Sequence, residues 1–162
     1  MNKQAGQIMV EALIALGVAV IIMAAITSMI ISALSSAITA KNQDLATQYA
    51  KQGVEVLRNI GKTNWSYLSE KEDGNYCLGE GKTTLTGADY NLYPQKGCDR
   101  NIGIFIRQVQ LEKFSPSSSC QNSSKVVVFV FWSDGKCANS NDQFCHSVRL
   151  ESCLSNVSNV SE

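Results

Sequence analysis

Apolar residues dominate the first quarter of the chain, whereas polar and apolar residues are mixed in the rest. Residues 12–40 contain no charged side chain, and the sequence from Lys41 onward has the mixed polarity of a water-soluble domain. At a rise of ~1.5 Å per residue, about 20 apolar residues cross a hydrocarbon core of roughly 30 Å. The segment exceeds that length and contains no proline, which favours a continuous helix. The pattern therefore predicts a transmembrane helix.

The next segment, residues 41–60, has the periodicity of an amphipathic helix. Gly53 and a set of apolar residues recur at steps of three or four and predict one face for a core: Leu45, Tyr49, Val56 and Ile60, flanked by Ala46, Ala50 and Leu57. The opposite face carries Asp44, Lys51, Glu55 and Arg58. Gly61 is a suitable C-terminal stop. Together with the apolar segment, this predicts one helix of about 50 residues.

The remainder of the chain predicts a small sheet. Residues 61–103 are rich in Gly, Asn, Asp and Thr, and we expect a long irregular connection with one or two short strands, such as 89–93 before Pro94. Three clearer strands follow. They are 104–114, the unbroken apolar run 125–132 that is typical of a strand covered on both faces, and the alternating segment 146–152 with one exposed face. The expected fold class is α+β, a long helix on a small antiparallel sheet.

The composition argues for an oxidising compartment and against general nucleic-acid binding. The 162 residues include 14 basic and 14 acidic side chains, so no net positive charge attracts phosphates. All six cysteines follow the apolar segment, and an even number suits disulfides, although six reduced thiols in a cytosolic protein are the alternative. Six cysteines allow 15 pairings. Proximity in the expected hairpin favours Cys137 with Cys145 and Cys120 with Cys153, which leaves Cys77 with Cys98.

No pattern of catalytic residues is present. The only histidine, His146, begins an expected strand, where a structural role is the simpler interpretation. No His pair or Cys-x-x-Cys pair gives zinc-ligand spacing, and there is no phosphate-binding loop or nucleophile elbow. Asp134 and residues 139–142 offer oxygen ligands, but turns use the same residues. We expect no enzymatic activity, no catalytic residue, no metal and no cofactor.

Glu11 is the only charge between Lys3 and Lys41. A carboxylate near the start of a membrane helix is costly and therefore suggests a function, although an interfacial carboxylate on a plain membrane anchor is the alternative. A secretory signal peptide does not explain the segment, because its apolar core would be only about 7–15 residues long.

Residues 6–17, GQIMVEALIALG, resemble the processing site of type IV prepilins and pseudopilins. The resemblance implies that a prepilin peptidase cuts between Gly6 and Gln7 on the cytoplasmic side and that the new N-terminus, Gln7, is methylated. Glu11 is then the fifth mature residue, which in the family pairs with the N-terminal amine of a neighbouring subunit. The sequence departs from the usual pattern at Gln7, where Phe or Met is common, and at Ile8, where Ser or Thr is common.

Two further segments resemble the V-type minor pilins and I-type minor pseudopilins: residues 50–60, and residues 125–135 together with 146–156. The resemblance implies a pilin fold with a disulfide-rich head. It divides the chain into a leader (1–6), a transmembrane half-helix (7–40), an amphipathic half-helix (41–61) and a globular β-rich head (62–162). The implied partners are membrane lipid, prepilin peptidase and other pilin or pseudopilin subunits.

The expected function is that of a structural minor subunit in a type IV pilus, a type II secretion system or a DNA-uptake filament. The expected location is the cytoplasmic membrane, with the N-terminus inside and the head outside, followed by the filament. The alternative is an uncleaved, single-span anchor that carries an extracytoplasmic binding module. The N-terminus of the mature protein distinguishes the two functions.

Overall fold

The structure is a computed structural model that describes residues 3–89, 97–113, 120, 123–134, 137 and 144–155, with side chains from residue 8 onward. The chain divides into two compact units, Met1–Lys41 and Asn42–Glu162. Helix α1 (Lys3–Thr63) contributes to both units.

The N-terminal unit is helical. Three of its hydroxyl groups bond to the backbone of the helix itself. Thr27 Oγ1 donates to the carbonyl of Met23 and Ser28 Oγ to that of Ala25, each at 2.8 Å, and Thr39 Oγ1 donates to that of Ser35 at 3.1 Å. Because these donors are satisfied within the helix, placing them in an apolar environment costs little free energy.

Helix α1 does not end at Gly61, as the sequence suggested, but continues to Thr63. The Oγ1 of Thr63 donates to the carbonyl of Asn59 at 2.8 Å. Asn64 then caps a second helix, α2 (Trp65–Ser69), by accepting a hydrogen bond from the backbone N–H of Tyr67. Gly61 remains helical, so the stop comes from the cap at Asn64 rather than from the glycine.

The strands of the second unit form one antiparallel sheet. Within the described residues its order is β2-β1-β3-β4-β5. The strands are β1 (Gly74–Cys77), β2 (Thr86–Gly87), β3 (Ile106–Glu112), β4 (Ser124–Trp132) and β5 (His146–Leu154). The three late strands lie close to their expected positions. The expected strand at 89–93 falls almost wholly outside the described residues, and Asp89 itself is not in a strand.

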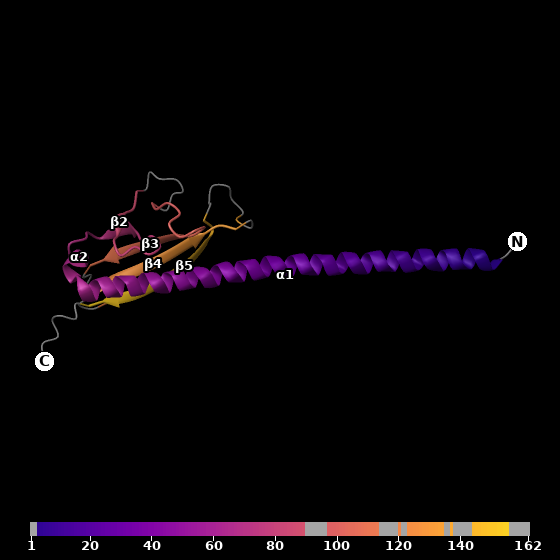
Figure 1. Ribbon diagram of the computed structural model, residues 1–162, viewed down its shortest axis with the longest axis horizontal. Helices are drawn as coiled ribbons and strands as arrows, with labels where there is room; N and C mark the ends of the chain where they lie inside the picture. The colour runs from indigo at the N-terminus through magenta and orange to yellow at the C-terminus, as the bar shows by residue number, and fades with distance from the viewer. Residues whose placement is uncertain are drawn as a thin grey trace, which may run out of the picture. The chain divides into compact units, whose positions relative to one another are not determined.

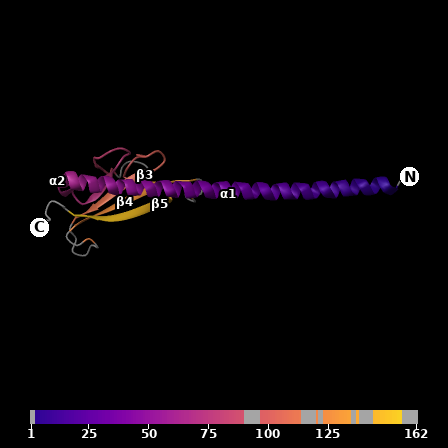
Figure 2. The same ribbon diagram turned by 60° about the horizontal axis from the view of Figure 1, so that its bottom comes forward.

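The C-terminal part of α1 packs along one face of the sheet (Figures 1 and 2). The buried residues of this core include four from α1, four at alternate positions of β4 and two from β3: Ala46, Ala50, Val54 and Leu57 with Val126, Val128, Val130 and Trp132 and with Val109 and Leu111. Leu45, Tyr49 and Val56, three of the residues expected at the centre of the face, are only partly buried. The buried stripe is thus turned by about one position from the predicted one. The α+β class, with a helix on an antiparallel sheet, is confirmed.

The other face of the sheet carries a smaller core of Cys98, Ile106 and Phe144, with Cys77 and Phe131 packed against it. On this face of β4, Val127 is buried and Phe129 is half-buried, so the strand is covered on both faces only in part. In β5 the side chains alternate as expected, and Arg149 and Glu151 are exposed.

Candidate functional site

An exposed apolar surface covers the N-terminal unit. From Ile8 to Ile38 the large apolar side chains of α1 are each more than half exposed. Among the described residues, one helix is long and apolar enough to cross a membrane, and none of its most apolar stretch is buried within the chain. Apolar surface of this extent is unfavourable in water. It fits contact with lipid or with apolar helices of other molecules.

Glu11 is exposed on this surface. Among the side chains that the structure describes, it is the only charged one from residue 8 to residue 40. Among the described side chains, the carboxylate of Glu11 has no salt-bridge partner. A carboxylate in such surroundings lowers its free energy by meeting a cation, and that cation has to come from outside the described side chains.

Gly6 and Gln7 lie in the helical backbone of α1, and the side chain of Gln7 is outside the described part. Gln7 and Glu11 are four positions apart, which is about one helical turn, or ~6 Å along the axis. The backbone nitrogen of Gln7 and the carboxylate of Glu11 therefore belong to neighbouring turns of one helix. An amine at that nitrogen would lie about one helical turn from the carboxylate.

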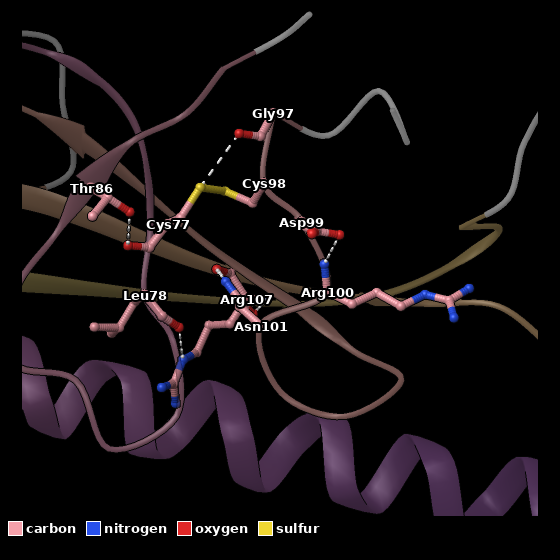
Figure 3. Close-up of a disulfide and its surroundings, with 9 residues drawn as sticks. All are labelled: Cys77, Leu78, Thr86, Gly97, Cys98, Asp99, Arg100, Asn101 and Arg107. Carbon is pink, nitrogen blue, oxygen red and sulfur yellow. Dashed lines mark hydrogen bonds between the residues drawn. A yellow bond between two sulfur atoms is a disulfide. The ribbon is translucent and has the colours of Figure 1, made fainter. Parts of the chain in front are cut away.

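All six cysteines lie within the described residues and are paired. The disulfides are Cys77–Cys98, Cys120–Cys153 and Cys137–Cys145, the same pairs that the chain order favoured, with Cα–Cα distances of 5.5–5.6 Å. Cys77–Cys98 joins β1 to the segment before β3 (Figure 3). Cys120–Cys153 joins the segment before β4 to β5.

A buried arginine joins the helix to the sheet, and the sequence analysis did not single it out. Arg107 on β3 is only 2% exposed. Its Nε donates to the carbonyl of Leu78 at 2.9 Å and its Nη2 to that of Gly79 at 2.7 Å (Figure 3 shows the first). Nη1 donates to the carbonyl of Tyr49 on α1 at 3.1 Å. Two backbone segments, α1 and the segment that follows β1, are thus held to β3 by one side chain.

The charge of Arg107 is compensated mainly by these carbonyl dipoles. Burial lowers the pKa of the guanidinium, and the negative charge of Glu80 opposes that shift. Asn101 holds the backbone of β3 at the same residue. Its side-chain oxygen accepts from the Arg107 N–H at 2.8 Å, and its side-chain nitrogen donates to the Arg107 carbonyl at 2.9 Å. The sequence contains one clue: Arg107 shares its face of β3 with Val109 and Leu111, at an inward position.

Comparison with known proteins identifies no relative: no family model, no curated protein and no solved structure matches the chain.

Proposed function

We propose that the chain is a membrane-anchored structural subunit whose head folds in an oxidising compartment outside the cytoplasm. Within that class, it is a minor pilin-like or pseudopilin-like subunit of a type IV pilus, a type II secretion system or a DNA-uptake filament. The carrying observation is Glu11, a lone carboxylate on an exposed apolar helix one turn after the Gly6–Gln7 bond.

The proposed assembly step pairs two charges that are each unfavourable in lipid. Cleavage between Gly6 and Gln7 releases a protonated amine at the start of the helix, and methylation of that nitrogen keeps its positive charge. A carboxylate and an amine that meet between two subunits neutralise each other, whereas each alone remains costly. Association is therefore favoured over the separate subunits in the membrane.

The head supplies the part of the subunit outside the membrane. A domain of this size gains stability from cross-links, and three disulfides contribute roughly 2–4 kcal/mol each. Disulfides persist in extracytoplasmic compartments, which supports a head outside and an N-terminus inside. The partners in this proposal are membrane lipid, a prepilin peptidase and other filament subunits. The protein has no enzymatic role.

The mature N-terminus tests the proposal directly. In cells that contain a prepilin peptidase, the mass of the membrane-extracted protein should correspond to a chain that starts at Gln7 with a methyl group. Gly6→Ala should block cleavage, because it removes the glycine that matches the last leader residue of prepilins. Ala5→Gly is the matched control and should be cleaved normally. A mature chain that keeps residues 1–6 would favour the uncleaved anchor instead.

A further inference from the structure

Four potential metal-ligand groups meet where β4 ends and β5 begins. They are the carboxylate of Asp134, the sulfurs of Cys137 and Cys145, and the imidazole of His146, and their ligand atoms all lie within 4.8 Å of one another. Asp134 Oδ2 is 3.1 Å from His146 Nε2. The sheet register explains the meeting: Trp132 pairs with His146, so the residues that follow β4 lie beside those that precede β5.

This donor set is typical of zinc. Zn²⁺ accepts thiolate, imidazole and carboxylate ligands in a tetrahedron, whereas Ca²⁺ and Mg²⁺ prefer oxygen ligands alone. At metal–ligand distances of about 2.0–2.3 Å, the corners of that tetrahedron are roughly 3.3–3.8 Å apart. Groups within 4.8 Å of one another reach these positions through shifts of about 1 Å. The exception is the pair of sulfurs, which are bonded to each other and must separate.

The Cys137–Cys145 disulfide is the most accessible of the three. Cys145 is exposed and Cys137 is half-buried. The other two bonds each include a buried partner, Cys98 at 1% exposure and Cys120 at 4%, although Cys153 is itself exposed. Cys137–Cys145 is thus the one disulfide in which neither cysteine is buried. Because thiol–disulfide exchange requires an attacking group to reach a sulfur, a reductant acts first on Cys137–Cys145.

We propose that these four residues form a zinc site when the Cys137–Cys145 bond is reduced. A dithiol reductant transfers two electrons and two protons to the cysteines and itself becomes a disulfide. The two thiols then release two protons as they bind one Zn²⁺, and His146 and Asp134 complete the coordination. Cys137 and Cys145 are therefore linked in both states, by a disulfide when oxidised and by a metal ion when reduced. This proposal is independent of the pilin function.

The ligands stay close to one another without the disulfide. Cys137 is held near Asp134 because its backbone N–H donates to the Asp134 carbonyl at 3.3 Å. Cys145 precedes His146, whose ring stacks on buried Trp132 with centroids 5.3 Å apart. The backbone thus places Asp134 beside Cys137, and the core places His146 next to Cys145. Fewer side chains then need to be ordered when zinc binds.

The test uses the full-length protein in detergent micelles. An immobilised phosphine, which is oxidised to its oxide, reduces the accessible disulfide and is then removed. Mass spectrometry after alkylation confirms that Cys77–Cys98 and Cys120–Cys153 remain bonded. Co²⁺ then serves as a spectroscopic probe, followed by displacement with Zn²⁺. We expect one Co²⁺ per reduced chain, with thiolate charge-transfer bands and intense tetrahedral visible bands, and neither feature in the oxidised chain.

Variants assign the ligands. Cys137→Ser/Cys145→Ser should show no thiolate bands after the same treatment, and His146→Gln should weaken Zn²⁺ binding roughly 100-fold or more. Cys120→Ser/Cys153→Ser is the control, because it removes another disulfide but keeps the four ligands, and it should bind like the parent. Circular dichroism checks that each variant is folded. A reduced parent chain without cobalt bands, or equal bands in Cys137→Ser/Cys145→Ser, would overturn the proposal.

Discussion

Gly53 on α1 lies so close to Val128 on β4 that a Cβ atom built on the glycine would be 3.0 Å from Cγ1 of the valine. The same Cβ would be 3.1 Å from Cδ of Arg107. Val128 is fully buried and has a stiff, β-branched side chain, so it cannot move aside freely. The absence of a side chain at Gly53 therefore allows the helix to approach the sheet at this point.

We predict that Gly53→Ala destabilises the head by about 1 kcal/mol. Overpacking costs roughly 1–3 kcal/mol, and the better helix propensity of alanine recovers up to about 1 kcal/mol. Gly61→Ala is the matched control, because a Cβ there meets its nearest neighbours at an ordinary 3.7 Å. That variant should gain up to about 1 kcal/mol. Urea unfolding of the full-length proteins, followed by tryptophan fluorescence, measures both. Equal stabilisation by the two changes would contradict the close contact.

Replacing the buried arginine should be more damaging. Arg107→Met removes the donors to three carbonyls and should lower the free energy of unfolding by about 2–4 kcal/mol. Arg107→Lys should recover only part of this loss, because an ammonium lacks the planar array of donors. Arg149→Met, at an exposed position on β5, should change stability by less than about 0.5 kcal/mol. An Arg107→Met chain as stable as the Arg149→Met chain would show that the three bonds contribute nothing net.

Alkaline pH should destabilise the head through Tyr76. Burial first, then the negative charges of Glu72 and Asp73, raise the pKa of this phenol above its ordinary value of 10.0. As pH rises, the unfolded phenol loses its proton before the folded one does. The stabilising contribution is therefore fully present below pH 10 and is lost as pH rises through the folded pKa. Unfolding free energies measured on both sides of pH 10 should fall more steeply in the parent than in Tyr76→Phe. The same pH dependence of the unfolding free energy in the parent and in Tyr76→Phe would contradict a raised pKa of Tyr76.

The last prediction separates assembly from anchoring. Glu11→Ala should leave membrane insertion and head folding intact, because it removes a charge from an apolar helix. Incorporation into sheared filaments should nevertheless fall, since the attraction to a neighbouring amine is lost. Glu11→Gln, which keeps the shape without the charge, should behave like Glu11→Ala. Quantifying the subunit in the filament and membrane fractions measures the effect. Equal incorporation of parent and variants would refute a pairing role for Glu11.

The sequence predicts the parts of the fold whose hydrophobic pattern is long and regular. The uncharged stretch 12–40 and the apolar run 125–132 each have one simple interpretation. The alternation in residues 146–152 likewise predicts the exposed face of β5. Helix α2 and the short strands β1 and β2 were not located, because elements of two to five residues have too few positions for a period. The extension past Gly61 depends on the cap at Asn64.

The relations between distant residues were harder to predict. Arg107 interrupts the apolar inward pattern of β3, and only the carbonyls of Tyr49, Leu78 and Gly79 explain how a charge is tolerated there. The two remote disulfides were favoured because the expected hairpin brings Cys120 and Cys153 together, which leaves Cys77 and Cys98 as a pair. Asp134 beside His146 follows from the exact pairing of β4 with β5, which periodicity alone does not fix.

The position of β5 has a consequence for incomplete chains. Among the described residues, this strand is the last in the sequence and lies at the edge of the sheet beside β4, with which it pairs from Ser124–Leu154 to Trp132–His146. Any product that stops before residue 146 leaves one side of β4 without a partner, along the segment VVVFVFW. Such an edge is apolar, uncharged over seven residues and rich in β-formers, so it recruits like strands from other molecules. Prematurely terminated chains should therefore aggregate or be degraded rather than persist as shortened soluble heads.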